Sequence, residues 1–434
     1  MLSKYKEILP GVNLRVVQTD KFKTACFSVN FLDKLSCEFA SLNALLPMVL
    51  CRGSKKMPDM QSISEVTDNL YGAKIEPIVR KFGDVQAFGV VCDLIDGRYT
   101  DEGSDLLKKC IKVTGEILFN PLIKKNEFLP EYVLSEAENL KDDIRSEINE
   151  KLSYAYMRAM SCMYTDGGFG LNKMGDLEQV EKITSKDLFA RYQHIVKTAP
   201  VEIFFCGNAS FEEVERAVVK EFKELKGRDA CLIKISNPLV NLEQSETIET
   251  MDMAQAVLLL GVGTCITFAS EEFYAMRLLS VILGGGTASK LFTNVREKHS
   301  LCYYTGTRYD RYSGSMFMYC GVDPEKVDKA RAQMLRQMRL CIDGVIDDTE
   351  IKKAKRQLLN QLKTVNDSPY LLENYWLNET VCKTGISTES AASSISKVSK
   401  DEIINSAKAC ELKLTYLLTG KGENVHERKY LRGN

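Results

Sequence analysis

An arginine and a tyrosine seven residues apart, Arg296 and Tyr303, are the side chains of this sequence best suited to chemistry. Both are hydrogen-bond donors, and the guanidinium is permanently charged. Three glycines, Gly284 to Gly286, precede them where an apolar helix over residues 270–283 is expected to end. Glycine there can end a helix with a positive φ and lets another chain approach the backbone closely.

Two adjoining elements are expected to position this pair. A short helix is expected over residues 289–298, because its apolar residues recur at the spacing of one buried face, and Arg296 falls in its last turn. A β-strand is expected over residues 301–307, with Tyr303 on it. On these grounds alone, an exposed arginine and a half-buried tyrosine in an ordinary helix–turn–strand remain the simpler interpretation.

The segment from Gly284 to Tyr303 reads Gly-Gly-Gly-x-x-Ser-x-Leu-Phe-x-x-Val-Arg-Glu-Lys-x-x-Leu-x-Tyr. This sequence motif resembles one in the second half of the pitrilysin/insulinase metallopeptidases, the inverted zincins. The resemblance is closest to the inactive bacterial members of their processing-peptidase-like branch. The resemblance implies that Arg296 and Tyr303 contact the substrate backbone and help to stabilise the developing oxyanion. It also implies that the loop of Gly284, Gly285 and Gly286 touches substrate.

The metal site is the decisive question that this resemblance raises. The family binds zinc through H-x-x-E-H on a helix, because residues four apart share a helix face. The matching helix is expected over residues 39–51, and Arg52-Gly53-Ser54 after it resembles the family's ending for that helix. In that register Ala44 and Met48 replace the two histidines, and Pro47 replaces the glutamate. Alanine offers no ligand, methionine suits zinc poorly, and proline inside a helix costs ~3 kcal/mol.

No other part of the chain offers a conventional zinc site. The acidic third ligand of the family lies on a later helix, where this chain has Asp142, Asp143 and Glu147, but several acidic residues on a long helix usually form a solvated face. A degenerate motif with no metal and no cofactor in this chain is therefore expected. The three histidines lie in different elements without H-x-x-H or H-x-x-x-H spacing: His194, His299 and His426.

Composition excludes several classes of partner. The chain has 434 residues, a formal net charge of −1, 44% apolar and 27% charged residues, which is ordinary for a soluble globular protein and does not favour nucleic acid or an anionic membrane. Residues 1–7 contain no apolar signal region, and no apolar run reaches membrane-spanning length. The fourteen cysteines are scattered without a C-x-x-C pair, as expected in a reducing cytosol. A cytoplasmic protein without a membrane span is expected.

The order of elements suggests an internal duplication. Length alone favours two or three domains, and the weakly patterned residues 226–244 form a candidate linker. Short echoes recur on either side, such as Val90-Val91-Cys92-Asp93 and Cys320-Gly321-Val322-Asp323. We expect an α+β protein of two homologous halves, 1–228 and 245–434, each a mostly antiparallel sheet with helices packed on one face. The resembled family, with its mitochondrial-processing-peptidase-like metallohydrolase fold, has this plan.

Individual elements can also be placed along the chain. Hydrophobic periodicity of the 3.6-residue type predicts two long helices, over about residues 126–163 and 349–378. The strands expected in the first half cover residues 14–17, 24–31, 74–79, 85–92 and 201–206.

The resemblance implies a chain that keeps a substrate-handling segment and lacks the metal motif. We expect the non-zinc-binding subunit of a two-subunit zinc-dependent peptidase, which supplies peptide binding and oxyanion stabilisation for the processing of a peptide or small protein. Zinc is expected in the partner, a zinc-binding homologous subunit in a heterodimer; a homodimer remains open. Alone, the chain is expected to have no activity.

Three other interpretations remain. The main alternative is a non-catalytic structural or regulatory member of the same family that binds a peptide or a partner. A solitary enzyme with another nucleophile is disfavoured, because no serine, cysteine or lysine has a recognisable elbow or base partner. A nucleotide site at residues 284–290 is disfavoured too, because a phosphate loop lies between strand and helix and has glycine before its lysine, whereas here the loop follows a helix and Ser289 precedes Lys290.

Overall fold

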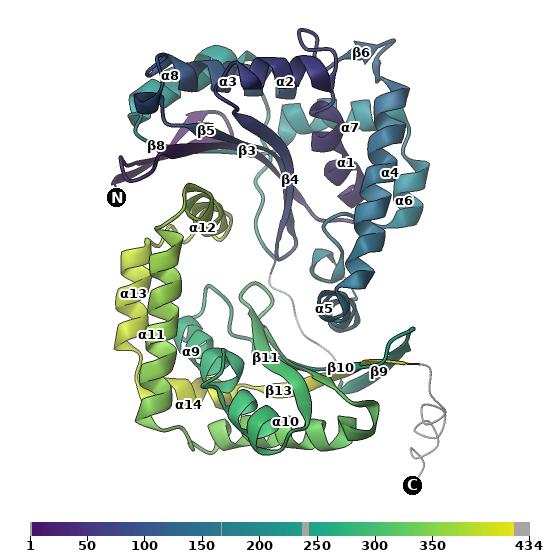
Figure 1. Cartoon of the computed structure of the whole chain (residues 1–434), viewed down its shortest axis with the longest axis vertical. Coiled ribbons are helices and arrows are strands. Elements are labelled where there is room, and N and C mark those ends of the chain that lie inside the picture. The colour runs from purple at the N-terminus through teal and green to yellow at the C-terminus, as the bar shows by residue number, and fades with distance from the viewer. Residues whose placement is uncertain (1, 166, 237–242, 421–434) are drawn as a thin grey trace. The chain divides into compact units, whose positions relative to one another are not determined.

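The structure is a computed structural model that describes residues 2–165, 167–236 and 243–420 (Figure 1). Residues 237–242 of the expected linker, and His426, lie outside the described residues. The chain forms two compact units, each with its own sheet. Unit 1 is built from the described parts of Met1–Ser146, Leu171–Ser236 and Thr364–Gly385, and unit 2 from those of Glu147–Gly170, Asn237–Lys363 and Ile386–Asn434.

Unit 1 contains a six-stranded sheet in the order β1-β2-β8-β3-β5-β4. Neighbouring strands are antiparallel except β2 and β8, which run parallel. The central strands β3 and β5 are buried along most of their length, because both faces of the sheet are covered. The strands are β1 (Leu2–Leu9), β2 (Val12–Gln18), β3 (Thr24–Lys34), β4 (Lys74–Phe82), β5 (Val85–Ile95) and β8 (Val201–Gly207), with a separate short pair, β6 (Ile123–Lys124) and β7 (Glu127–Phe128).

Helices cover one face of this sheet with the main apolar core of unit 1. Alternate residues of β2, Val12, Leu14 and Val16, point into that core. Helices α1, α3 and α8 pack against the strands, and α4, α6 and α7 surround α1 or its neighbours. The helices are α1 (Ala40–Leu50), α2 (Met60–Asp68), α3 (Asp105–Phe119), α4 (Pro130–Ser146), α6 (Leu177–Lys182), α7 (Ser185–Thr198) and α8 (Phe211–Glu221), with short turns η1 (Gly97–Tyr99) and η4 (Lys223–Leu225).

The opposite face of the same sheet is covered by a helix from much later in the sequence. Helix α12 (Pro369–Val381) packs on β3 and β8. The contact joins Leu372 and Trp376 of the helix to Val17 and Phe204 of the strands, in a small apolar cluster of its own. Unit 1 is therefore not a continuous stretch of sequence.

Unit 2 contains a five-stranded sheet in the order β11-β12-β10-β13-β9. All neighbouring pairs are antiparallel except β13 and β9. Strand β10 is buried at every residue and forms the centre of the unit, whereas β11 lies at an edge. The strands are β9 (Ser245–Thr250), β10 (Ala256–Gly263), β11 (Cys302–Asp310), β12 (Ser315–Val322) and β13 (Glu411–Thr419).

Unit 2 also receives a helix from the other half of the sequence. Helix α5 (Lys151–Met163) packs on β10 and β13. Gly261 allows this close packing, because a Cβ atom there would lie 2.5 Å from the sulfur of Met163. The other helices are α9 (Phe273–Gly284), α10 (Val327–Ile342), α11 (Asp348–Val365), α13 (Thr388–Lys397) and α14 (Lys400–Lys408), with the π-helix η5 (Phe292–Lys298) and short turns η2 (Glu147–Asn149), η3 (Gly168–Gly170) and η6 (Pro324–Lys326).

The expected α+β fold, with two mostly antiparallel sheets and the main set of helices on one face of each, is confirmed, and α12 is an additional helix on the other face of the unit 1 sheet. Both predictions of a single long helix were wrong. The expected helix over 126–163 is split into α4 and α5, and only α5 belongs to unit 2. The expected helix over 349–378 is split where Ser368 caps a new helix that begins at Pro369, a residue without a backbone N–H. The division of the chain into two homologous halves, 1–228 and 245–434, remains a prediction.

Candidate functional site

The glycine run ends helix α9 against the edge strand β11. Gly284 is buried, and a Cβ atom there would lie 2.5 Å from the backbone nitrogen of Thr307, so this position has no room for a side chain. The carbonyl of Gly285 accepts a hydrogen bond from the amide of Gln357. Gly286 is exposed and has φ +155°, in the region that favours glycine. Packing therefore explains Gly284, and Gly286 is the glycine whose backbone is open to a ligand.

The next segment is anchored by its buried side. The carbonyl of Gly286 accepts a hydrogen bond of 2.6 Å from the hydroxyl of Ser289. Lys290 is buried and forms an ion pair of 2.9 Å with Glu350 on α11. An ammonium group held by a carboxylate does not resemble the lysine of a phosphate loop.

The helix then widens into a π-helix that presents Arg296. Leu291 and Val295 are fully buried, whereas Arg296 is exposed, with its guanidinium 4.7 Å from the ring centre of Phe292. The π-helix closes with a 3.0 Å hydrogen bond from the N–H of Leu301 to the carbonyl of Val295. Such π-helical segments are rare in proteins, and those that do occur are often found at functional sites.

The turn into β11 is conformationally unusual at two positions. Ser300 has φ +49°, a left-handed conformation that is uncommon for a residue with a side chain. Tyr303 is the extra residue of a β-bulge, because the pairing with β12 shifts between Cys302 and Tyr304. Its ring is 55% exposed. A bulge aims a side chain away from the regular alternation of the strand, and here it leaves the phenol in solvent.

The structure brings the two predicted donors onto consecutive, packed elements. The π-helix lies against β11. The charge of Arg296 also reaches the thiol of Cys302, the residue before Tyr303: burial raises the pKa of this thiol to about 11, and Arg296 partly offsets the rise. Unit 2 thus carries an exposed cation and an exposed phenol beside the edge of a sheet, where both can donate hydrogen bonds to a carbonyl or an oxyanion.

In unit 1, the three residues that we expected to replace the zinc motif lie on helix α1. Ala44 is fully buried, Pro47 lies inside the helix and is buried, and Met48 is partly buried against the core. None of these side chains has a nitrogen or carboxylate oxygen, so the helix does not fit a zinc ion. The α1 segment instead packs as a core helix.

A buried hydrogen-bond network holds the first turns of α1 in place. The amide of Asn43 donates to Gln86 at 2.9 Å and to Asp33 at 3.2 Å, and it accepts a hydrogen bond of 2.9 Å from the Nε of Arg191. Arg191 also pairs with Asp33, and burial lowers the pKa of its guanidinium, an effect that Asp33 opposes. This network was not predicted from the sequence. Its signal was Asn43 itself, the polar residue in the middle of an apolar helix.

The acidic residues of α4 likewise have other partners. Asp142 and Asp143 are exposed, and Asp142 pairs with Arg145 at 2.9 Å. The buried carboxylate of α4 is Glu136, which lies 3.3 Å from the guanidinium of Arg52 just beyond α1. Among the residues that the structure describes, no group of three or more histidines, cysteines and carboxylates is placed to hold a metal ion. Within the same described ranges, no helix is both long and apolar enough to cross a bilayer.

Comparisons with known proteins agree on one family. A model of the peptidase M16 inactive domain matches residues 182–358, which include the segment from Gly284 to Tyr303. The chain is 27% identical to a probable inactive metalloprotease of Bacillus subtilis, YmfF, over 94% of this chain and 96% of that protein. It is 23% identical to an uncharacterized zinc protease of Rickettsia felis, over 70% and 72% of the two chains.

Solved structures show the same similarity in three dimensions. A conserved protein from Enterococcus faecalis superposes with a TM-score of 0.88 at 28% identity, over 97% of this chain and 99% of that one. A peptidase M16 inactive domain from Pseudomonas fluorescens superposes with a TM-score of 0.81 at 15% identity, over 97% and 99% of the chains, and so bears on the fold alone.

Proposed function

We propose, since the chain matches a model of the peptidase M16 inactive domain and aligns along most of its length with a probable inactive metalloprotease, that it is the zinc-free subunit of a two-subunit zinc-dependent peptidase. Its partner would be a homologous subunit with an intact H-x-x-E-H helix. The pair would process a peptide or small protein. This chain would supply peptide binding and oxyanion stabilisation, and it would not hydrolyse peptides without its partner. A cytoplasmic location is part of the proposal, supported by fourteen cysteines of which none forms a disulfide.

The observation that carries the proposal is a contrast between the two units. In unit 1, Ala44 and Pro47 are buried in an apolar helix without ligand atoms. In unit 2, Arg296 and Tyr303 are exposed. The arginine lies on a π-helix and the tyrosine on a β-bulge, and both are irregular backbone. Exposed donors on irregular backbone favour a binding role, because a purely structural segment would gain nothing from this geometry.

The proposed roles follow from the chemistry of the donors. Peptide hydrolysis develops negative charge on the scissile carbonyl oxygen, and donors that are already oriented stabilise it without reorganisation. Arg296 would supply a charged donor and Tyr303 a neutral O–H donor to this oxygen or to neighbouring carbonyls. The free edge of β11 would hold the extended peptide backbone by strand addition, and Gly286 would let it approach closely.

A second function remains compatible with the same surface. The chain could bind a peptide or a partner protein in a structural or regulatory role, without contributing to bond cleavage. This alternative is compatible with the buried ion pair of Lys290 and Glu350, which joins the segment to α11 without using the exposed donors. It predicts that assembly and peptide binding persist when the two donors are removed.

Kinetics of the assembled pair distinguish these functions. The variants Arg296→Ala and Tyr303→Phe are each combined with the zinc-binding subunit, and steady-state cleavage of a peptide is measured. Loss of one oxyanion donor is expected to lower kcat by about 10²–10³-fold, with a smaller effect on KM. The matched controls are Lys298→Ala, another exposed cation of the π-helix, and Tyr304→Phe on the adjacent, half-buried position; both should keep kcat within a factor of about three.

Assembly is verified in each case by analytical ultracentrifugation. If both donor variants assemble and cleave at the unmodified rate, the catalytic role is excluded and the structural alternative is preferred. If the control variants lose as much kcat as the donor variants, the loss is not specific to Arg296 or Tyr303.

A further inference from the structure

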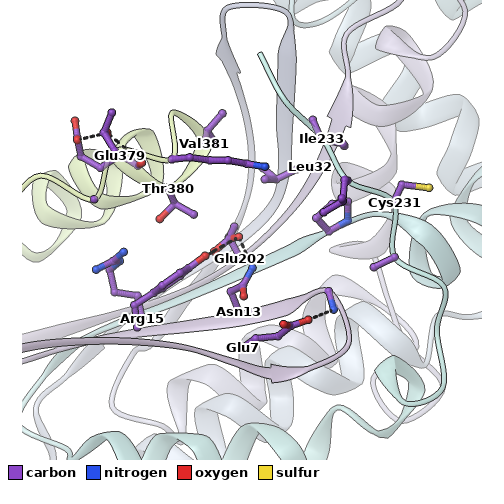
Figure 2. Close-up of a pocket in the computed structure, with 18 residues that line it drawn as sticks. Glu7, Asn13, Arg15, Leu32, Glu202, Cys231, Ile233, Glu379, Thr380 and Val381 are labelled. Atoms are coloured by element: carbon purple, nitrogen blue, oxygen red, sulfur yellow. Dashed lines mark hydrogen bonds between the residues drawn. The ribbon is translucent and has the colours of Figure 1, made fainter. Parts of the chain in front are cut away.

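Unit 1 contains a cavity of about 570 Å³ that is separate from the segment discussed above (Figure 2). Its floor is formed by side chains of β1, β2 and β8, on the sheet face that α12 also covers. Its walls are the extended segment 230–233 and the C-terminal end of α12 with the following residues 383–385. This volume is suited to a ligand the size of one or two amino-acid residues.

One side of the floor is acidic. Glu202 is 8% exposed, and its carboxylate accepts 2.8 Å and 3.3 Å hydrogen bonds from Asn13 and Tyr5 (Figure 2). Burial raises the pKa of Glu202 to about 7, although Asn13, Tyr5 and Arg15 oppose the rise. The carboxylate is therefore incompletely compensated, and a cation beside it would favour its ionised form.

The other side of the floor is basic. Arg15 is 9% exposed, and its guanidinium lies between the rings of Tyr5 and Trp376, with 4.4 Å and 4.2 Å to the ring centres. One of its nitrogens donates to Ser3, but its buried Nε has no hydrogen-bond partner among the described residues. Burial lowers the pKa of Arg15, and Tyr5, Glu202 and Glu379 only partly offset this. An anionic group would stabilise it.

The remaining walls are largely apolar. Leu32, Ile233 and Val381 line the cavity on the side of Glu202 away from Arg15 (Figure 2). The other charged groups are Glu7 at the edge, whose carboxylate accepts a hydrogen bond of 2.8 Å from the N–H of Gly11, Glu379, which accepts from the hydroxyl of Thr384, and Lys383. The cavity thus combines the buried guanidinium of Arg15 and the buried carboxylates of Glu202 and Glu379 with an apolar surface on one side.

We propose that this cavity binds a small zwitterion, an α-amino acid or a dipeptide with an apolar side chain. The ammonium group lies at Glu202 and Asn13, the carboxylate at Arg15, and the side chain against Leu32, Ile233 and Val381. A ligand of this class compensates Glu202 and Arg15 at once, which neither a simple amine nor a simple carboxylic acid can do. The site is independent of the proposed peptidase role, since none of its residues belongs to unit 2.

Calorimetry on the full chain tests the proposal with leucine and Leu-Leu as probes. Each is compared with leucinamide, which lacks the carboxylate, and with N-acetyl-leucine, which lacks the ammonium group. At least one of the two zwitterions should bind about tenfold or more tightly than either single-charge analogue. Its affinity should rise between pH 6 and pH 8 with release of a proton, because the ammonium group favours the ionised form of Glu202. A longer peptide that is bound only through its N-terminal ammonium group makes no use of its C-terminal carboxylate. Such a peptide would bind equally well when its C-terminus is amidated.

Two variants assign the ends of the ligand. Glu202→Gln should weaken binding of the zwitterion by about tenfold and remove the pH dependence, whereas Glu7→Gln at the edge should leave both unchanged. Arg15→Met should weaken the zwitterion without affecting leucinamide, and Arg15→Lys should recover part of the affinity; circular dichroism checks that each variant is folded. The proposal is overturned if neither zwitterion binds at millimolar concentration, if an analogue with one charge binds as tightly, or if Glu202→Gln and Arg15→Met bind like the unmodified chain.

Discussion

At the residue scale, the three residues expected to replace the zinc motif belong to a packed helix of unit 1. Ala44 and Pro47 are buried and Met48 packs against the core, and a network of Asp33, Asn43, Gln86 and Arg191 lies beside them. A buried polar group is tolerated only when it is hydrogen-bonded. The network therefore makes α1 a structural helix whose polar residue is needed for stability.

Replacement of Asn43 tests this interpretation. Asn43→Ala leaves Gln86 and the Nε of Arg191 without their partner in a buried environment, and it should lower the free energy of unfolding by about 2–4 kcal/mol. Urea denaturation measures the change. Asn405→Ala on the exposed face of α14 is the control and should change stability by less than about 0.5 kcal/mol. An equally small effect at Asn43 would mean that the network contributes nothing to holding α1.

Glu202 gives a pH dependence whose sign can be stated. Its pKa of about 7 in the folded chain is above the usual value for glutamate, so ionising it costs free energy only when the chain is folded. The free energy of unfolding should therefore fall as the pH rises from about 4.5 to about 7 through this group. Glu202→Gln should be more stable relative to the unmodified chain at pH 8 than at pH 5, by about 1–3 kcal/mol. Thermal unfolding at the two pH values checks this, and a difference of opposite sign would contradict it.

At the element scale, local patterns in the sequence predicted much of the molecule. The strands at 24–31 and 85–92 lie within β3 and β5, and the short helix with Arg296 in its last turns is present. The β-bulge at Tyr303 and the π-helix could not be predicted, because both depend on pairing with β12 and packing on β11 rather than on residue types. Strand β1 was missed, since charged residues interrupt its apolar pattern and it forms by pairing with β2.

The break between α4 and α5 was missed for a related reason. Apolar periodicity continues through residues 126–163, and periodicity cannot show that two parts of a helical stretch pack on different sheets. Helix α5 packs on β10 and is anchored by Arg158, which pairs with Glu249 of β9 at 2.9 Å. Its counterpart α12 is anchored in unit 1 by Glu373, which is fully buried and pairs with Arg80 of β4 at 2.7 Å.

The buried pair of α12 should be essential for its attachment. The carboxylate of Glu373 also accepts hydrogen bonds from Ser28 and Asn30, at 2.8 Å and 3.2 Å. Glu373→Ala leaves Arg80 as an uncompensated buried charge and should destabilise unit 1 by about 3–5 kcal/mol. Hydrogen exchange should then show faster exchange in α12 before any change in β10.

An exposed pair near the same helix provides the control. Lys21 and Asp367 lie 2.6 Å apart at the surface, and Asp367→Asn should change stability by less than about 1 kcal/mol. A double variant, Glu373→Leu with Arg80→Met, should regain most of the stability lost in Glu373→Ala, since it removes both buried charges. If the single variant exchanged like the control, the pair would not be what attaches α12.

At the scale of the whole molecule, each half of the sequence supplies one helix to the unit built mainly from the other half. Unit 1 needs α12 to cover Val17 and Phe204, and unit 2 needs α5 to cover β10. Without these helices each sheet would expose an apolar face. We therefore expect that the two halves predicted from the sequence do not fold independently of each other.

Fragments of the chain test this dependence. Residues 1–236 expressed alone should be unstable or aggregate, because they lack α12 and leave Arg80 unpaired. The same fragment with residues 364–385 joined by a flexible linker should fold cooperatively, as measured by near-ultraviolet circular dichroism and thermal unfolding. A linked peptide carrying the Glu373→Ala change is the matched control and should rescue less. Cooperative folding of residues 1–236 without the added helix would contradict this account.

The division of labour between two subunits is tested most directly by titration. Turnover of a peptide by a fixed amount of the zinc-binding subunit is measured while this chain is added. We predict a rise in turnover that saturates at one chain per zinc-binding subunit, and a double variant, Arg296→Ala with Tyr303→Phe, that saturates at the same ratio without the rise. The result that would contradict the account is a zinc-binding subunit equally active alone, or a double variant that restores full turnover.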